Sequence, residues 1–275
     1  MNSLEKVEVK SKEGPKYRWE MVKDIKTQEI KNIAPDLFKL AQKIFESGKT
    51  YDLILSDDAS GRLVSLFLRK VLNSIQEKQG LPVPDIRFVT ASHRSFKDVD
   101  AIYSKVSNIL KKLNPNRTLL VTEHVQTGRT MTALTRAFKI LSNHGLNFNF
   151  DIAALSIADQ KKLEDIQNLL KLPKNPENND QVFWGELGQT GFHNLHPKST
   201  KQNLAGVYSS YDPVDTIPHR LKQVFTEKEK KLDNVMNREY LKKEMEKAEG
   251  VQEKINQARE DINLLAEETL KEFGG

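Results

Sequence analysis

The sequence predicts an α/β fold with a mostly parallel, doubly wound sheet flanked by helices, a loop-rich hood and a long C-terminal helical extension. Short apolar runs alternate with segments of helical periodicity four times between residues 51 and 158, as is typical of βαβ units with right-handed crossovers. Residues 172–218 are rich in Pro, Asn and Gly, with only short apolar pieces. Residues 220–275 lack proline and carry a thin apolar seam, which indicates a long helix.

The spacing of apolar residues predicts each element in turn. Apolar residues recur at intervals of three and four from Ile33 to Phe45, which predicts a helix over 34–46 that ends near Gly48. Apolar runs such as YDLILS and RTLLVT then predict strands, and the periodic segments between them predict helices. The predicted strands cover 51–56, 86–91, 117–122 and 148–155, and the helices between and after them cover 63–75, 99–113 and 131–142.

The C-terminal seam allows two interpretations. Apolar residues step by threes and fours from Leu241 to Leu265, which predicts one long charged helix or two helices that meet near Gly250. The seam could pack on the protein's own domain, or it could form a coiled coil with a second copy or a partner helix through residues 220–272. We expect three regions. They are an N-terminal helix with the α/β core (1–158), a helix with the loop-rich hood (159–219) and a charged helical tail (220–275).

The composition makes a phosphate-bearing partner worth considering. The 275 residues include 43 Lys and Arg against 38 Asp and Glu, a net charge of +5, with no cysteine. The lack of cysteine excludes disulfides, thiolate nucleophiles and Cys-ligated metals. No apolar run is long enough for a membrane span, and no secretory signal is visible, so we expect a cytoplasmic protein. The positive excess lies entirely before residue 220, and no basic run is interleaved with aromatics. This pattern disfavours a nucleic-acid partner.

The segment after the third predicted strand carries the strongest functional signal. It spans residues 122–130 and reads TEHVQTGRT, and a helix is predicted immediately after it. Gly128 allows a tight turn, and the backbone amides that follow, with the helix dipole, would form a cradle for phosphate. Glu123 just before the cradle could accept hydrogen bonds from sugar hydroxyls.

This segment resembles the motif of type I phosphoribosyltransferases. Their signature is an apolar strand, two acids, an apolar residue, two variable residues and Thr-Gly-x-Thr. The spacing matches, but Thr122 replaces the first acid and His124 replaces the apolar residue. The resemblance implies a site for phosphoribosyl pyrophosphate or another ribose phosphate, with Thr122 and Glu123 at the ribose. The residues that would hold the 5′-phosphate are Thr127, Gly128, Arg129 and Thr130.

Gln126 occupies the position where some purine-specific members carry an acid. An amide cannot accept a proton there, which argues against plain purine salvage.

Two earlier loops fit the same resemblance. After the first strand, Ser60, Gly61 and Arg62 would hold pyrophosphate, with the guanidinium as a bidentate donor. Asp57 and Asp58 would reach a Mg²⁺ ion through water, or would instead cap the next helix and complement its dipole.

After the second strand, the loop over residues 92–97 would act as a lid. Arg94 and Lys97 would close over the pyrophosphate during catalysis. In the hood, aromatic residues could stack on an acceptor base or form a satellite core. These residues are Phe183, Trp184, Tyr208 and Tyr211.

These features predict a phosphoribosyltransferase-like protein. It would transfer the phosphoribosyl group to a nitrogenous acceptor, which the sequence does not identify, and release pyrophosphate. The alternative is a catalytically degenerate regulatory protein that binds a nucleotide or phosphosugar and assembles through its C-terminal helix. The loss of the first acid at Thr122 keeps this alternative open.

Overall fold

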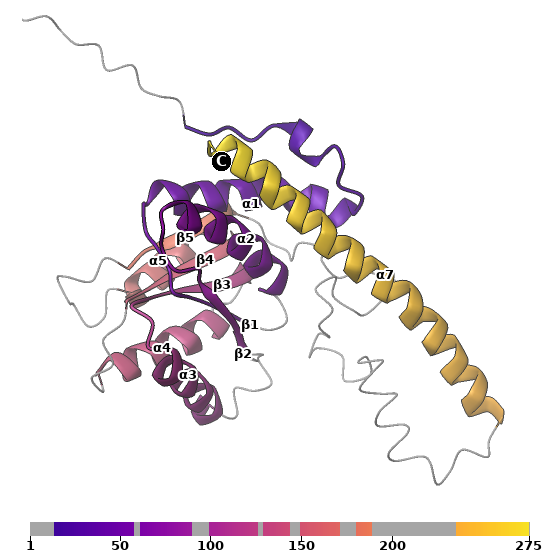
Figure 1. Ribbon diagram of the computed structural model, residues 1–275. Helices are drawn as coiled ribbons and strands as arrows, with labels where there is room; N and C mark the ends of the chain where they lie inside the picture. The colour runs from indigo at the N-terminus through magenta and orange to yellow at the C-terminus, as the bar shows by residue number, and fades with distance from the viewer. Residues whose placement is uncertain are drawn as a thin grey trace, which may run out of the picture.

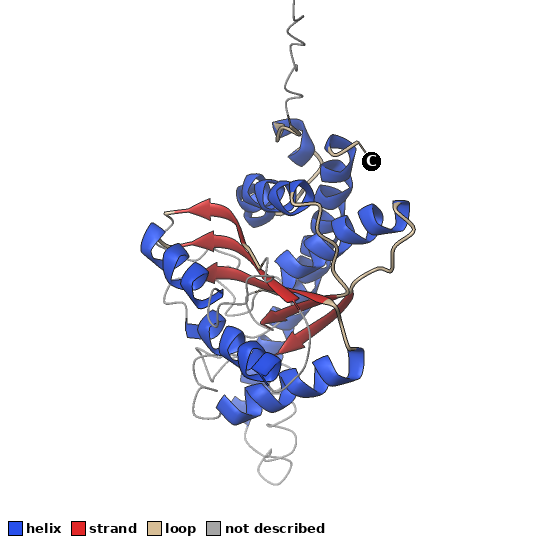
Figure 2. Ribbon diagram, turned by 90° about the vertical axis from the view of Figure 1, so that its left-hand side faces the viewer, coloured by secondary structure: helices blue, strands red, loops and turns tan. Residues whose placement is uncertain are grey.

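A five-stranded, all-parallel sheet forms the centre of the computed structural model, and helices cover both of its faces (Figures 1 and 2). The structure describes residues 14–57, 61–89, 99–125, 129–143, 149–170, 180–188 and 235–274. The strands are β1 (Leu53–Asp57), β2 (Asp85–Val89), β3 (Arg117–Val125), β4 (Asn149–Ile157) and β5 (Val182–Leu187), in the order β2-β1-β3-β4-β5. This arrangement confirms the predicted α/β class and the parallel sheet.

The helices divide between the two faces of the sheet. They are η1 (Trp19–Val22), α1 (Gln28–Glu46), α2 (Arg62–Lys78), α3 (Val99–Leu113), α4 (Arg129–Asn143), α5 (Gln160–Leu170) and α7 (Val235–Glu272). One apolar cluster joins α1, α2 and α7 to the sheet, and a second joins α3, α4 and α5 to the opposite face. Successive strand side chains point to opposite faces, so Ile54 enters the first cluster while Leu53 and Leu55 enter the second.

Several element boundaries differ from the sequence expectation. The first long helix begins at Gln28 rather than at residue 34, because Ile30 and Ile33 also face the core. β3 continues to Val125, so residues 122–125 belong to a buried strand and not to the predicted loop. β5 was not predicted as a strand, and it pairs with β4 at the edge of the sheet.

The two aromatic residues of β5 lie in different surroundings. Phe183 is buried in the core with α1, and Trp184 lies under the ammonium group of Lys43, 3.9 Å from the ring centroid. Phe183 therefore belongs to the core, which was the alternative to base stacking, whereas stacking by the partly exposed Trp184 stays a prediction. Tyr208 and Tyr211 lie outside the described residues.

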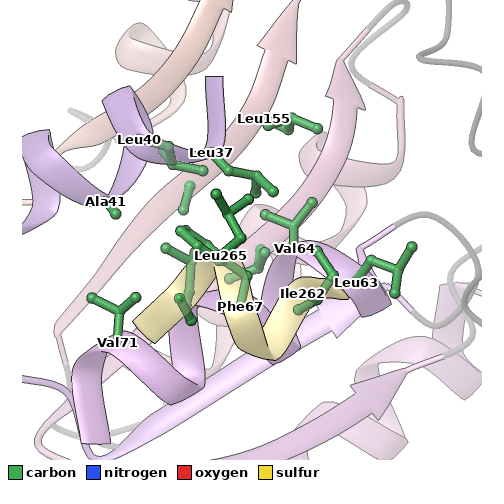
Figure 3. Close-up of a cluster of buried hydrophobic side chains, with 14 of the residues drawn as sticks. Leu37, Leu40, Ala41, Leu63, Val64, Phe67, Val71, Leu155, Ile262 and Leu265 are labelled. Atoms are coloured by element: carbon green, nitrogen blue, oxygen red, sulfur yellow. The ribbon is translucent and has the colours of Figure 1, made fainter. Parts of the chain in front are cut away.

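α7 is one continuous helix that passes through Gly250 without a break. Its C-terminal half lies across α1 and α2, and Ile262 and Leu265 point into the cluster between those helices (Figure 3). Its first turns project past the sheet and its covering helices (Figure 1). The interpretation of a helix packed on its own domain is confirmed for the C-terminal half, and self-association stays a prediction. In the described ranges, no helix combines the length and the apolar character needed to cross a membrane.

Candidate functional site

The strand order places the topological switch point between β1 and β3. β2 flanks β1 on one side, and β3, β4 and β5 follow on the other. In open parallel sheets of this order, ligands bind at the carboxyl ends of the two strands where the winding reverses. α2 begins at Arg62 after β1, and α4 begins at Arg129 after β3, so two helix N-termini start from this edge. Both present the positive end of a helix dipole, which favours an anion.

Gly61 brings the start of α2 against the strand ends. Its backbone N–H donates to the carbonyl of Asp57 at 3.2 Å. A Cβ atom at this position would lie 2.1 Å from the Ser56 hydroxyl, 2.6 Å from a carboxylate oxygen of Asp57 and 2.7 Å from the Val121 carbonyl. Only glycine can occupy this position, because any side chain would clash with these atoms. The absence of a side chain lets the first turn of α2 lie directly against β1 and β3.

Arg62 follows at the first position of α2, as the resemblance requires of a pyrophosphate ligand. Its guanidinium carbon lies 4.5 Å from the centroid of the Phe88 ring on β2. This cation–π contact holds the guanidinium group of Arg62 against the ring of Phe88 on the neighbouring strand.

Thr122 contacts the last residue of β1. Its buried hydroxyl donates to a carboxylate oxygen of Asp57 over a long distance of 3.4 Å. The position that carries the first acid in the family signature is therefore tied to Asp57, which was predicted as a metal ligand. These two residues are far apart in sequence, and the sheet brings them together.

Glu123 is 2% exposed at the same edge. Burial raises the pKa of its carboxyl group well above the ordinary value, and the negative charge of Asp57 raises it further. The carboxyl group of Glu123 therefore keeps its proton to a higher pH than an exposed glutamate does.

His124 makes a contact that the sequence did not predict. Its Nδ1 atom lies 2.7 Å from the hydroxyl of Ser156, which faces it across the β3–β4 pair. Both side chains are buried. The contact depends on the register between β3 and β4, which cannot be deduced from the spacing of residues along either strand.

The remaining predicted site residues are not all described. Those outside the described residues are Asp58, Ser60, Arg94, Lys97, Gln126, Thr127 and Gly128. Arg129 and Thr130 open α4, but the positions of their side chains are not described. Their roles in catalysis and in phosphate binding stay predictions.

The described residues at the switch point could help to bind Mg²⁺ but could not hold it by themselves. In the described part of the chain, no three His, Asp or Glu side chains gather into a metal-binding group. Mg²⁺ commonly keeps several waters and is held by one or two carboxylates together with substrate phosphates. The buried carboxylate of Asp57 suits that second mode and does not form a cage by itself.

Comparisons with protein-family models, with curated proteins and with solved structures gave no match to this chain. The candidate site is therefore identified by the motif and by the geometry of the switch point.

Proposed function

We propose that this chain is a phosphoribosyltransferase-like protein. It binds phosphoribosyl pyrophosphate or a related ribose phosphate at the carboxyl ends of β1 and β3. It then transfers the phosphoribosyl group to a nitrogenous acceptor and releases pyrophosphate. In this reaction the bond from the sugar carbon to the pyrophosphate oxygen breaks, a carbon–nitrogen bond forms, and the acceptor nitrogen loses a proton.

The observation that carries the proposal is the meeting of two distant segments at the switch point. The resemblance assigned residues around 57–62 to pyrophosphate and residues 122–130 to the ribose 5-phosphate. In the fold, Gly61 approaches Val121 across the two strands, and Thr122 reaches Asp57. Phosphoribosyl pyrophosphate carries its diphosphate and its 5′-phosphate on one ribose, so the two segments that bind these groups must lie next to each other.

Each segment has a separate task in the proposed complex. The N-terminus of α2 and Arg62 would take the pyrophosphate, where a guanidinium fork and backbone amides oppose its charge. The N-terminus of α4 would take the 5′-phosphate. Glu123 and Thr122 would contact the ribose hydroxyls. Mg²⁺ carried by the diphosphate would neutralise charge on the leaving group, with Asp57 binding it through water.

One observation favours the alternative of a regulatory binding protein. The sugar carbon gains positive charge as pyrophosphate leaves, and a nearby carboxylate would stabilise that charge. Here the first acid is Thr122, and burial favours the protonated form of Glu123. A ligand could therefore bind without efficient transfer, and the projecting turns of α7 would then be available for assembly.

Calorimetry with phosphoribosyl pyrophosphate and Mg²⁺, followed by a pyrophosphate-release assay over a panel of bases, separates the two candidates. Binding with base-dependent release supports the transferase. Binding without release for any base supports the regulatory protein. No binding would contradict both.

Arg62→Met tests the pyrophosphate position. The variant keeps the length of the side chain and removes the charge, so we expect binding of phosphoribosyl pyrophosphate to weaken about 10- to 100-fold. Arg87→Met is the control, because Arg87 is an exposed arginine on β2 that pairs with Asp85. If Arg62→Met and Arg87→Met bind phosphoribosyl pyrophosphate equally well, the pyrophosphate does not contact Arg62.

Gly128→Val tests the 5′-phosphate loop. This variant should abolish binding of phosphoribosyl pyrophosphate if the loop is assigned correctly.

A further inference from the structure

The family signature places two acids next to each other on one strand, and this chain has only the second of them there. Thr122 occupies the first position and Glu123 the second. A threonine hydroxyl is neutral, so it cannot give a sugar hydroxyl the charge-assisted hydrogen bond that a carboxylate gives. The fold brings a carboxylate to this position from the neighbouring strand.

Asp57, the last residue of β1, lies level with Thr122 on β3. Leu55 and Leu120 are register partners in these two parallel strands, and both enter the same apolar cluster. Asp57 and Thr122 lie two residues further along each strand and therefore share a face of the sheet. The hydroxyl of Thr122 donates to Oδ2 of Asp57 at 3.4 Å. The carboxylate of Asp57 is thus one hydrogen bond away from the residue that replaces the first acid.

The charge of Asp57 also acts on Glu123. It raises the pKa of the Glu123 carboxyl group, which burial already raises. Both side chains are buried at the carboxyl edge of the sheet, with Asp57 8% exposed and Glu123 2% exposed. Two carboxyl groups from two strands therefore interact at the switch point, where the signature takes both from one strand.

We propose that Asp57 takes the place of the missing first acid and that its carboxylate accepts a hydrogen bond from a ribose hydroxyl of the bound ligand. This proposal rests on the proposed function, because it adds a ligand contact to the same site. Thr122 is the positioning residue, since its hydroxyl holds the carboxylate. A carboxylate has two oxygens, so the ribose contact is compatible with a contact to water bound to Mg²⁺. With a carboxylate supplied from β1, the threonine at position 122 does not by itself indicate a loss of activity.

Asp57→Asn tests the contact by the sign of its effect. The variant removes the charge with little change in size, and asparagine caps a helix start as well as aspartate does. Phosphoribosyl pyrophosphate is an anion, so a carboxylate that contacted neither the ligand nor its metal would only repel it. We expect Asp57→Asn to weaken binding about 10- to 100-fold in calorimetry with Mg²⁺. Unchanged or tighter binding would overturn the proposal.

Asp159→Asn is the matched control. Asp159 lies in the exposed turn after β4, at the same edge of the sheet, and accepts from the backbone N–H of Lys162 at 2.8 Å. The variant removes one negative charge from this edge and keeps a cap for α5, so affinity should not fall. An equal loss in Asp57→Asn and Asp159→Asn would show that no specific contact is made by Asp57.

An exchange variant separates the carboxylate from the strand that carries it. Asp57→Thr should bind as weakly as Asp57→Asn does. Asp57→Thr combined with Thr122→Asp returns the carboxylate to the position of the signature and keeps one threonine beside it, so most of the lost affinity should return. A folded double variant that binds no better than Asp57→Thr would count against the proposal. Urea titration shows whether each variant is folded, and if the double variant is not, the titration with Mg²⁺ decides.

The titration with Mg²⁺ separates a ribose contact from a contact through the metal. Loss of a ribose contact weakens binding at every Mg²⁺ concentration, whereas loss of a metal contact weakens only the ligand that carries Mg²⁺. We expect the loss in Asp57→Asn to persist at the lowest Mg²⁺ concentration at which the unaltered chain binds. A loss that shrinks toward zero there leaves Asp57 with the metal alone and overturns the ribose contact.

The same measurements distinguish this proposal from the proposed function. If the unaltered chain does not bind phosphoribosyl pyrophosphate, the proposed function fails and the ribose contact fails with it. If the unaltered chain binds and Asp57→Asn binds equally well, only the role of Asp57 is overturned.

Discussion

At the scale of single residues, the burial of Glu123 has a measurable consequence for stability. The folded protein holds this carboxyl group in its protonated form to a higher pH than the unfolded chain does, because burial and the charge of Asp57 raise its pKa. The unfolded group titrates near 4.5. As pH rises above that value, the unfolded state loses its proton first, so ionisation of Glu123 favours unfolding.

We therefore expect Glu123→Gln to stabilise the protein increasingly as pH rises. At pH 4 the two proteins should have similar free energies of unfolding, and at pH 8 the variant should be more stable, as measured by urea titration at each pH. Glu77→Gln, at an exposed position late in α2, is the control and should show no such trend. A difference that is constant with pH would show that Glu123 is not held in its protonated form.

The sequence predicted where Thr122 and Glu123 lie but not what they contact, and the chemistry assigned to them stays a prediction. Glu123 and Thr122 were assigned to the site by their distance from the Thr-Gly-x-Thr turn, and both lie at the switch point. Their burial was not predicted, since it depends on β3 extending to Val125 between two neighbouring strands. The partner of His124 is 32 residues away, on a strand whose register only the folded sheet defines.

At the scale of elements, Asp151 ties together the amino ends of neighbouring strands. Its buried carboxylate accepts from Lys49 at 2.8 Å, from Arg117 at 2.9 Å and from the Tyr51 hydroxyl at 3.0 Å. The backbone N–H of Gln181, just before β5, donates to it at 2.6 Å. This cluster lies at the opposite edge of the sheet from the candidate site, so its role is in holding the strands.

We expect Asp151→Ala to lower the free energy of unfolding by about 3–5 kcal/mol, because the change removes a fully buried carboxylate and leaves the buried Tyr51 hydroxyl and two partly buried cations without their acceptor. Chemical denaturation measures the loss. Asp165→Ala is the control, since it removes an exposed ion pair with Lys162 on α5 and should cost less than about 1 kcal/mol. A similar cost for both variants would mean that solvent already screens the Asp151 cluster.

The start of α1 depends on a residue more than two hundred positions away. Thr27 precedes the helix without a side-chain cap of its own. Asp261 of α7 instead accepts from the backbone N–H groups of Lys26 at 3.2 Å and Thr27 at 2.6 Å. The helix was predicted to begin at residue 34 because the apolar spacing was followed only from Ile33 onward, although Thr27 is an ordinary N-cap residue and Glu29 is an acid in the first turn. The sequence could not show that the far end of the chain supplies the acceptor for the backbone N–H groups at this start.

We expect Asp261→Ala to destabilise the protein by about 2 kcal/mol, as the loss of an N-cap with charge-assisted bonds does. Thermal and urea unfolding measure the change. Glu260→Ala, one residue earlier and exposed on the same helix, should leave stability nearly unchanged. If the two variants unfold alike, α1 does not depend on α7 for its cap.

At the scale of the whole molecule, the regions predicted from composition share a common core. Phe183 of β5 and Ile262 of α7 lie in the same apolar cluster as α1 and α2. The alternation of strands and helices between residues 51 and 158 was predictable because each element shows its own periodicity. The positions of β5 and α7 could not be predicted, because a short apolar run and a thin apolar seam do not indicate which surface of the protein they pack against.

The shared core predicts that α7 and the sheet unfold together. Leu265 is 0% exposed between α1 and α2, whereas its neighbour Leu264 is 39% exposed. Leu265→Ala should lower the free energy of unfolding by about 2–5 kcal/mol, through lost burial and the cavity that remains. Leu264→Ala should change it by no more than about 0.5 kcal/mol.

Both variants are followed by circular dichroism, which reports largely on the helices, and by fluorescence of Trp184, which reports on β5, in a Trp19→Phe background. In one cooperative unit the two signals change at the same denaturant concentration, and Leu265→Ala shifts both by the same amount. If Leu265→Ala shifts only the helical signal while Trp184 keeps its midpoint, α7 is a separable appendage of the sheet. In that case the cap that Asp261 provides would not be needed for the α/β fold to form.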